Sequence, residues 1–119
     1  MDSIVRVSIG IPIFNAEKFL ESAISSVLCQ TFKNFELILS DDGSTDKSLE
    51  IARSFNDSRI IIISDNANKG IAYRLNEQLA IAKGSYFVRM DADDLMFPNR
   101  VEKQVKFLEN HPDIDVVGS

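Results

Sequence analysis

The sequence predicts an α/β fold built on a doubly wound, mostly parallel sheet with helices on both faces. Segments typical of strands and of helices alternate along all 119 residues, and short connections join them. The strand segments are runs of apolar, often β-branched residues, as expected for strands covered on both faces. In such a sheet, ligands bind beyond the carboxyl ends of the strands, so the residues at those ends indicate the function.

The first strand and the first helix follow directly from the residue pattern. Val5 to Ile13 alternates β-branched residues and ends near Pro12, because proline cannot donate a hydrogen bond to a sheet. Glu17 to Cys29 has apolar residues with a 3.6-residue period, and Asn15 is its candidate cap. We expect the apolar side of this helix to face the core. Its members are Phe19, Leu20, Ala23, Ile24, Val27 and Leu28.

The second strand, the second helix and the third strand continue the alternation. Phe35 to Ser40 is an apolar strand. Ser44 and Thr45 are expected to cap the helix that follows, with Asp46 in its first turn near the positive end of the helix dipole. Ile60 to Ile63 is wholly apolar, which is typical of a strand covered on both faces.

The last part of the chain adds two helices and a strand. Gly70 opens a third helix that Gly84 closes, and Tyr86 to Met90 is the fourth strand. Pro98 starts a fourth helix, which His111-Pro112 is expected to end. Periodicity predicts that the third helix packs inward through Ile71, Leu75, Leu79 and Ala82.

The acidic run Met90-Asp91-Ala92-Asp93-Asp94-Leu95 is the most informative feature of the sequence. Aspartate is a poor strand residue, and crowded carboxylates repel one another, so packing alone does not explain them at a strand end. In an extended segment, Asp91 and Asp93 would share one side while Ala92 turns away. Oxygen ligands of this kind suit a hard ion such as Mg²⁺ or Mn²⁺. A solvated acidic turn is the structural alternative.

The ends of the first two strands carry further candidates. Asp41 and Asp42 end the second strand; one of them is expected to cap the next helix, and the other could accept a hydrogen bond from a pyrimidine base. Phe14 could stack on that base or fill the core. The chain has no glycine-rich phosphate loop of the dinucleotide-binding or P-loop type. An ion at Asp93, aided by Arg74 or Arg89, would have to neutralise a bound phosphate.

Composition narrows the class of protein. A net charge of −5 and a pI near 4.8 argue against non-specific nucleic-acid binding. The single Cys29 cannot form an internal disulfide and is expected to be buried. The sequence shows neither a run of membrane-spanning length nor a signal peptide, so we expect a cytoplasmic protein, at the inner face of the membrane if its acceptor is lipid-linked.

Taken together, the motifs resemble the N-terminal half of a family 2 glycosyltransferase with the GT-A fold. The likeness covers essentially the whole chain and keeps the order and spacing of the motifs. Val116-Val117 begins a strand, so the resemblance implies a Rossmann-like sheet that is incomplete at its C-terminus, with residues 1–119 as the nucleotide-sugar-binding part. The blocks that carry the resemblance are Val7 to Asn15, Ser26 to Phe32, Phe35 to Asp46, Ala82 to Tyr86 and Arg89 to Asp94.

The resemblance assigns the first group of site residues to the nucleotide. Pro12 and Phe14 would border the uracil and ribose of a UDP-sugar, and Asp42, rather than Asp41, would contact the base. Asp41 would not contact the nucleotide itself and would support the residues that do. Arg74 is assigned to the nucleotide on weaker grounds, since the basic residue of this region varies in position within the family.

The acidic run would hold the metal ion. The resemblance implies that Asp91 lies near the ribose, that Asp93 ligates Mn²⁺ or Mg²⁺ together with Asp91, and that Asp94 orients its neighbours. In the complete enzyme a carboxylate base deprotonates the acceptor hydroxyl, and the displacement inverts the anomeric centre. That base is expected beyond Ser119. The acceptor would be a saccharide or a lipid-linked glycan, in bacterial polysaccharide assembly by family analogy.

Two other functions are compatible with the pattern. The chain could be a non-catalytic nucleotide-sugar-binding module, because it contains no candidate for the base. A phosphoacceptor receiver domain fits less well, because its paired acids should follow the first strand, which here ends in Ile11-Pro12-Ile13. Peripheral membrane association and a homo-oligomer are further expectations, the latter because an incomplete sheet exposes apolar surface.

Overall fold

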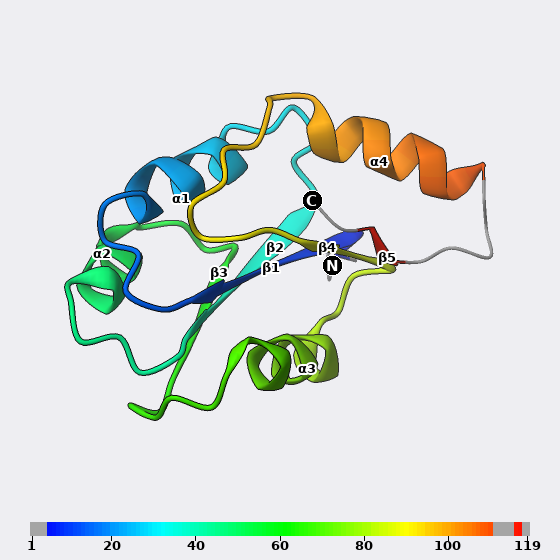
Figure 1. The fold of residues 1–119 in the computed structure, drawn as a ribbon. Coiled ribbons are helices and arrows are strands. Elements are labelled where there is room, and N and C mark those ends of the chain that lie inside the picture. Colours follow the sequence, from blue (N-terminus) through cyan, green and yellow to red (C-terminus); the bar gives the residue numbers. More distant parts are fainter. Residues whose placement is uncertain (1–4, 111–115, 118–119) are drawn as a thin grey trace.

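The computed structural model describes residues 5–110 and 116–117. Strands and helices alternate along the chain as the sequence predicts (Figure 1). In chain order the elements are β1 (Val7–Ile13), α1 (Leu20–Leu28), β2 (Phe35–Asp41), α2 (Ser48–Ser54), β3 (Ile60–Ser64), α3 (Ile71–Ile81), β4 (Tyr86–Arg89), α4 (Arg100–Glu109) and β5 (Val116–Val117). Among the described helices, none is long and apolar enough to cross a membrane.

The sheet has five strands in the order β3-β2-β1-β4-β5, and every neighbouring pair is parallel. The chain builds β1, β2 and β3 in one direction and then returns to place β4 on the other side of β1. This confirms the predicted doubly wound parallel sheet. Because β2 and β4 both flank β1, the carboxyl ends of all three strands meet at one edge, and the order reverses between β1 and β4.

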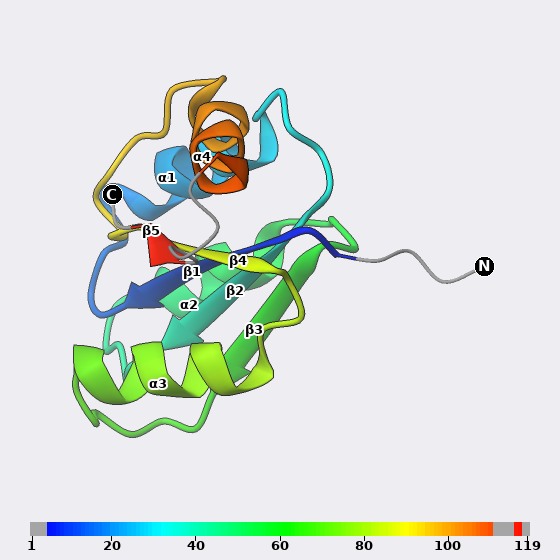
Figure 2. The same ribbon diagram turned by 90° about the vertical axis from the view of Figure 1, so that its right-hand side faces the viewer.

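Helices cover both faces of the sheet. In Figure 2, α1 and α4 lie above the sheet and α3 lies below it. Helix α2 packs beside α1. The face under α1 and α4 is apolar: Ile9, Ile11 and Ile13 of β1 are fully buried there against α1. Each such side chain contributes roughly 1.5–3 kcal/mol on burial.

The face under α3 carries buried polar side chains, and α3 packs closely against it. A Cβ added at Gly10 of β1 would lie 2.3 Å from Oε1 of Gln78, so α3 can pack closely only against glycine. The Gln78 amide donates to the carbonyl of Ile38 (3.2 Å) and to the hydroxyl of Ser40 (3.0 Å). Hydrogen bonds from the side chain of Gln78 therefore attach α3 to β2.

The predicted inward side of α3 is wrong. Ile71 and Leu79 are 43% and 46% exposed, while Arg74 and Gln78 are fully buried. The reason lies in the sheet, because Gly10 leaves space for Gln78 and Ser40 accepts a hydrogen bond from its amide. The apolar period of the helix instead places Ile71 and Leu79 on its exposed flank.

The predicted helix caps also differ from the structure. Helix α1 begins at Leu20, and Asn15 does not cap it; Oδ1 of Asn15 accepts from the Thr45 N–H at 2.8 Å. Helix α2 begins at Ser48, and Asp46, which precedes it, accepts from the Ser48 N–H at 2.9 Å. Ser44 and Thr45 therefore join two loops rather than cap α2.

Two further predictions have different outcomes. Cys29 is exposed rather than buried. The residues predicted to end the fourth helix, His111-Pro112, lie outside the described residues.

Candidate functional site

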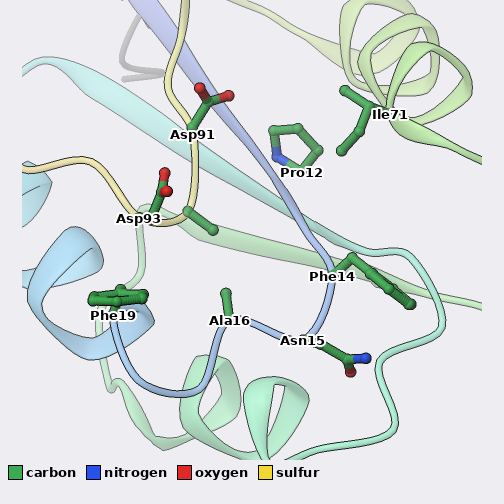
Figure 3. A pocket seen from close by; sticks show the side chains of 9 residues that line it. Pro12, Phe14, Asn15, Ala16, Phe19, Ile71, Asp91 and Asp93 are labelled. Carbon is green, nitrogen blue, oxygen red and sulfur yellow. The ribbon is translucent and has the colours of Figure 1, made fainter.

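A cavity of about 500 Å³ opens at the carboxyl ends of β1 and β4, where the strand order reverses (Figure 3). It brings together four of the residues predicted from sequence: Pro12 and Phe14 from the end of β1, and Asp91 and Asp93 from the loop after β4. Segments far apart in sequence thus converge on one pocket. The remaining lining residues are Asn15, Ala16, Phe19, Ile71 and Ala92.

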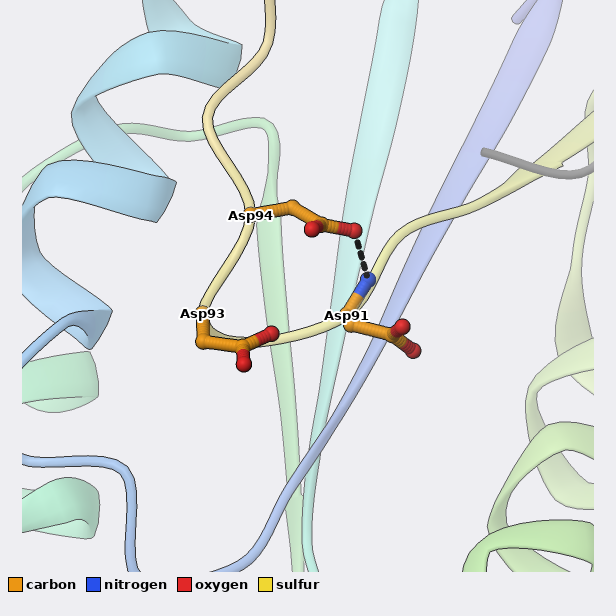
Figure 4. Close-up of side chains that lie close together, drawn as sticks. All are labelled: Asp91, Asp93 and Asp94. Atoms are coloured by element: carbon orange, nitrogen blue, oxygen red, sulfur yellow. Dashed lines mark hydrogen bonds between the residues drawn. The ribbon is translucent and has the colours of Figure 1, made fainter.

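The acidic run forms a turn rather than the extended segment that we expected. The Asp94 N–H donates to the carbonyl of Asp91 at 3.1 Å, and the Asp94 carboxylate accepts from the Asp91 N–H at 3.3 Å (Figure 4). Ala92, at the centre of the turn, is only 9% exposed and packs against the core. The turn, and not strand alternation, therefore gathers the carboxylates.

The three carboxylates are close enough to share one ion. One oxygen each from Asp91, Asp93 and Asp94 lies within 4.8 Å of the others. Asp91 and Asp93 are exposed and line the cavity. An oxygen-only donor set open to a pocket suits a hard divalent ion that keeps positions for substrate oxygens. Arg89 lies nearby, with Nη2 3.3 Å from Oδ1 of Asp91.

Asp42 and Arg74 lie outside the cavity and form a buried ion pair beside it. Nε of Arg74 donates to Oδ1 of Asp42 at 2.9 Å, and both side chains are at most 3% exposed. Burial alone would raise the pKa of Asp42, but hydrogen bonds from Lys69, Arg74 and Gly70 outweigh it and hold the pKa below its usual value. Hydrogen bonds with Asp65, opposed by burial, raise the pKa of Arg74. Both groups are charged at neutral pH.

All five N–H groups of Arg74 have protein acceptors. Besides Asp42, they are Asp65, Glu77 and the carbonyl of Ala67. The predicted direct contact of Arg74 with a nucleotide does not fit this geometry, because no donor remains for a phosphate. Arg74 instead holds Asp42 in place.

Asp42 in turn holds the start of α3. Its carboxylate accepts from the backbone N–H groups of Lys69 (2.7 Å) and Gly70 (3.1 Å), immediately before Ile71, which lines the cavity. A contact between Asp42 and a base stays a prediction. Asp41 fits a structural role: one oxygen accepts from the Ser44 N–H at 3.3 Å, and the other is buried without a partner among the described residues.

Sequence reasoning missed several residues of the cavity wall. Periodicity predicts that Phe19 and Ile71 face the core, but both are exposed at the cavity. Periodicity identifies an apolar side of a helix without distinguishing a core from a pocket wall. Asn15 has a φ of 47°, in the left-handed region that asparagine tolerates. An asparagine directly after Phe14 was the signal in the sequence that could have identified Asn15 as a residue of the cavity wall.

Comparison with known proteins identifies the family of the chain. The family model described as glycosyl transferase family 2 matches residues 8–119. The putative glycosyltransferase EpsE of Bacillus subtilis is 47% identical over 122 residues, covering 100% of this chain and 44% of that protein. UDP-Glc:alpha-D-GlcNAc-diphosphoundecaprenol beta-1,3-glucosyltransferase WfaP of Escherichia coli is 41% identical over 103 residues, covering 87% of this chain and 41% of WfaP. The chain spans less than half the length of these relatives.

Solved structures share the same fold. S. aureus TarS 1-349 in complex with UDP-GlcNAc superposes with a TM-score of 0.83 at 26% identity, covering 90% of this chain and 32% of that one. The mannosyltransferase PcManGT from Pyrobaculum calidifontis, in complex with GDP-Man and Mn²⁺, has a TM-score of 0.79 at 27% identity, covering 87% of this chain and 32% of that one. These neighbours support the Rossmann-like GT-A fold that the sequence predicts.

Proposed function

Because this chain belongs to glycosyl transferase family 2, we propose that it is the donor-binding part of an enzyme that transfers a sugar from a UDP-sugar to an acceptor hydroxyl. The observation that carries the proposal is the cavity at the carboxyl ends of β1 and β4, which combines the apolar walls Pro12 and Phe14 with the carboxylates of Asp91 and Asp93. A nucleotide-sugar needs both kinds of group. Relatives and neighbours whose names include UDP-Glc and UDP-GlcNAc support UDP as the nucleotide.

Different residues of the cavity wall would contact different parts of the donor. The ring of Phe14 is 46% exposed and can stack against the base. Pro12 lies at the end of β1, in register with Ser40 of β2, and offers an apolar surface to the ribose. Asp91, on the opposite wall, would accept from ribose hydroxyls. Asp42 would contact the base and also fixes the start of α3, and Arg74 would act indirectly by holding Asp42 in place.

Asp93, with Asp91, would hold a Mn²⁺ or Mg²⁺ ion, and the oxygen-only set of the acidic turn fits such an ion. When bound, the ion neutralises the diphosphate and stabilises negative charge on the leaving UDP. Asp94 fixes the turn through its hydrogen bond to the Asp91 N–H. A PcManGT complex that contains Mn²⁺ supports this assignment.

The acceptor step is proposed for the full-length enzyme. We infer inversion at the anomeric centre, with the base supplied from outside the part of the chain described here. The name of WfaP includes a diphosphoundecaprenol-linked acceptor, which supports a lipid-linked glycan and action at the inner membrane face.

Isothermal titration calorimetry of the 119-residue chain tests the donor assignment. We expect UDP to bind in the presence of Mn²⁺ and to lose at least tenfold in affinity in excess chelator, because the diphosphate is then no longer neutralised. GDP is the matched control, since PcManGT binds a GDP-sugar, and should bind more weakly than UDP. UDP binding that is indifferent to chelator would refute the metal assignment, and no binding to a folded sample would refute the donor site.

A further inference from the structure

Phe19 is the one aromatic wall of the cavity to which the proposed function has so far given no role. Its side chain is 54% exposed and lines the cavity. In Figure 3, Phe19 and Phe14 lie on opposite sides of the view, with Ala16 and Asn15 between them. Asp93 lies on the Phe19 side, and Pro12 and Ile71 lie on the Phe14 side. Two aromatic rings therefore line the cavity, and Asp93 lies nearer to the side of Phe19 than to that of Phe14 in this view.

Local stability does not explain a phenylalanine at this position. Phe19 is the N-cap of α1, and no side-chain cap hydrogen bond is formed there within the described residues. Serine, threonine, aspartate and asparagine are preferred at N-caps because they bond the free N–H groups of the first turn. Core packing does not explain it either, because Leu20 and Ile24 next to it are fully buried while Phe19 is not. A residue that breaks a local rule without a structural gain indicates a functional role.

The backbone of Phe19 is held in place without a ligand. Its N–H donates to the carbonyl of Ala16 at 3.0 Å. The preceding loop is tied to the start of α2 and to the residues before it, because the Ala16 N–H donates to Oγ of Ser48 at 2.8 Å and the Glu17 N–H donates to Asp46 at 3.2 Å. Such a preorganised wall loses little entropy when a ligand packs against it.

We propose that Phe19 is the platform on which the sugar ring of the donor packs, while Phe14 packs against the base. This inference rests on the proposed function. A nucleotide diphosphate sugar has a flat base at one end and a pyranose at the other, with the diphosphate between them. The C–H face of a pyranose is apolar and packs against an aromatic ring, as ligand pockets commonly arrange. Since Asp93 lies on the Phe19 side of the cavity, a diphosphate held there would direct the sugar toward Phe19.

The test compares UDP with UDP-GlcNAc and UDP-glucose by calorimetry in Mn²⁺, for the wild type and for Phe19→Ser. The wild type should bind at least one of the UDP-sugars more tightly than UDP. In the variant, that UDP-sugar should lose roughly fivefold in affinity, the value of one aromatic contact, while UDP changes by less than about twofold. The melting temperature should stay the same or rise, because serine at the N-cap can bond the first turn of α1.

Two variants serve as controls. Phe14→Ala should weaken UDP and the UDP-sugars equally. Phe107→Ser removes a phenylalanine of α4 that is 47% exposed outside the cavity, and it should leave both affinities unchanged. The inference is overturned if Phe19→Ser weakens UDP and the UDP-sugars alike, if it changes neither, or if the wild type binds the UDP-sugars no better than UDP. If the wild type fails to bind UDP at all, the proposed function itself falls.

Discussion

The two faces of the sheet are built on different principles. Under α1 and α4, fully buried isoleucine, valine and leucine side chains form a core whose stability comes from removing apolar surface from water. Under α3, the buried side chains include Arg74, Gln78, Ser40 and Asp42. Buried ion pairs are weak sources of stability, because desolvation offsets much of their attraction, but they are costly to break. The apolar face thus stabilises the sheet, and the polar face fixes where α3 begins beside the cavity.

Breaking the polar face should have the largest effect. Arg74→Ala leaves Asp42 buried and unpaired, so we expect a loss of about 3–5 kcal/mol in the free energy of unfolding, measured with urea. UDP affinity of the folded fraction should also fall, because the start of α3 and Ile71 shift. Arg53→Ala, at an exposed position of α2, is the matched control and should cost less than about 0.5 kcal/mol. A loss below about 1 kcal/mol for Arg74→Ala would show that the pair does not hold α3.

Breaking the apolar face should affect stability alone. Leu37 of β2 is fully buried in the core, and Leu37→Ala should cost about 2–4 kcal/mol through lost burial and a cavity. UDP affinity measured under fully folded conditions should stay within about twofold of the wild type, since the residue lies away from the carboxyl ends of the strands, where the cavity opens. If Leu37→Ala reduces UDP affinity as much as Arg74→Ala does, the claim that the apolar face affects stability alone is wrong.

Acid should weaken the polar face selectively. The pKa values of Asp42 and Asp65 both lie below the ordinary 3.8 in the folded protein. A lowered folded pKa adds stability that is present above the ordinary value and is lost as pH falls through the folded one. In Arg74→Ala, both carboxylates lose the hydrogen bonds from Arg74 that help to lower their pKa values. The stability gap between wild type and variant, followed by urea unfolding, should therefore shrink as pH falls from about 7 to about 3. A gap that stays constant would exclude these carboxylates as its source.

The acidic turn should contribute least to stability. Asp93→Ala removes one of three neighbouring carboxylates, so the melting temperature should stay unchanged or rise slightly as repulsion is relieved. Mn²⁺-dependent UDP binding should be lost in the same variant. Glu102→Ala, in the first turn of α4 and outside the cavity, is the control and should leave UDP binding unchanged. A large drop in melting temperature for Asp93→Ala would instead favour a structural role for the turn.

The strands and the position of the cavity could be predicted because both follow from short-range rules. Apolar runs predict covered strands, and parallel strands bring their carboxyl ends to one edge, which is why Pro12, Phe14, Asp91 and Asp93 were found together. The burial of Arg74 could not be predicted, because it depends on Asp42 and Asp65, which only the tertiary fold brings next to it.

The role of α3 escaped prediction for the same reason. Its apolar period is real, but Gly10 and Ser40 of the sheet leave space and polar partners that select Gln78 for the buried side. Phe19 was misassigned because a helix stripe can extend one residue past the core into a pocket wall. Periodicity describes one element at a time, whereas these contacts depend on two.

Paramagnetic broadening by Mn²⁺ in the presence of UDP tests the central claim most directly, because it locates the ion in the folded chain. If the acidic turn holds the ion, the backbone amide signals of residues 91–94 and of Ile11 and Ile13, the neighbours of Pro12, should broaden first, and UDP should strengthen the effect. Signals from Arg6 and Asn34, which line a groove formed by the starts of β1 and β2 and by α4, should stay sharp. Broadening centred on that groove, or broadening that UDP leaves unchanged, would contradict the account.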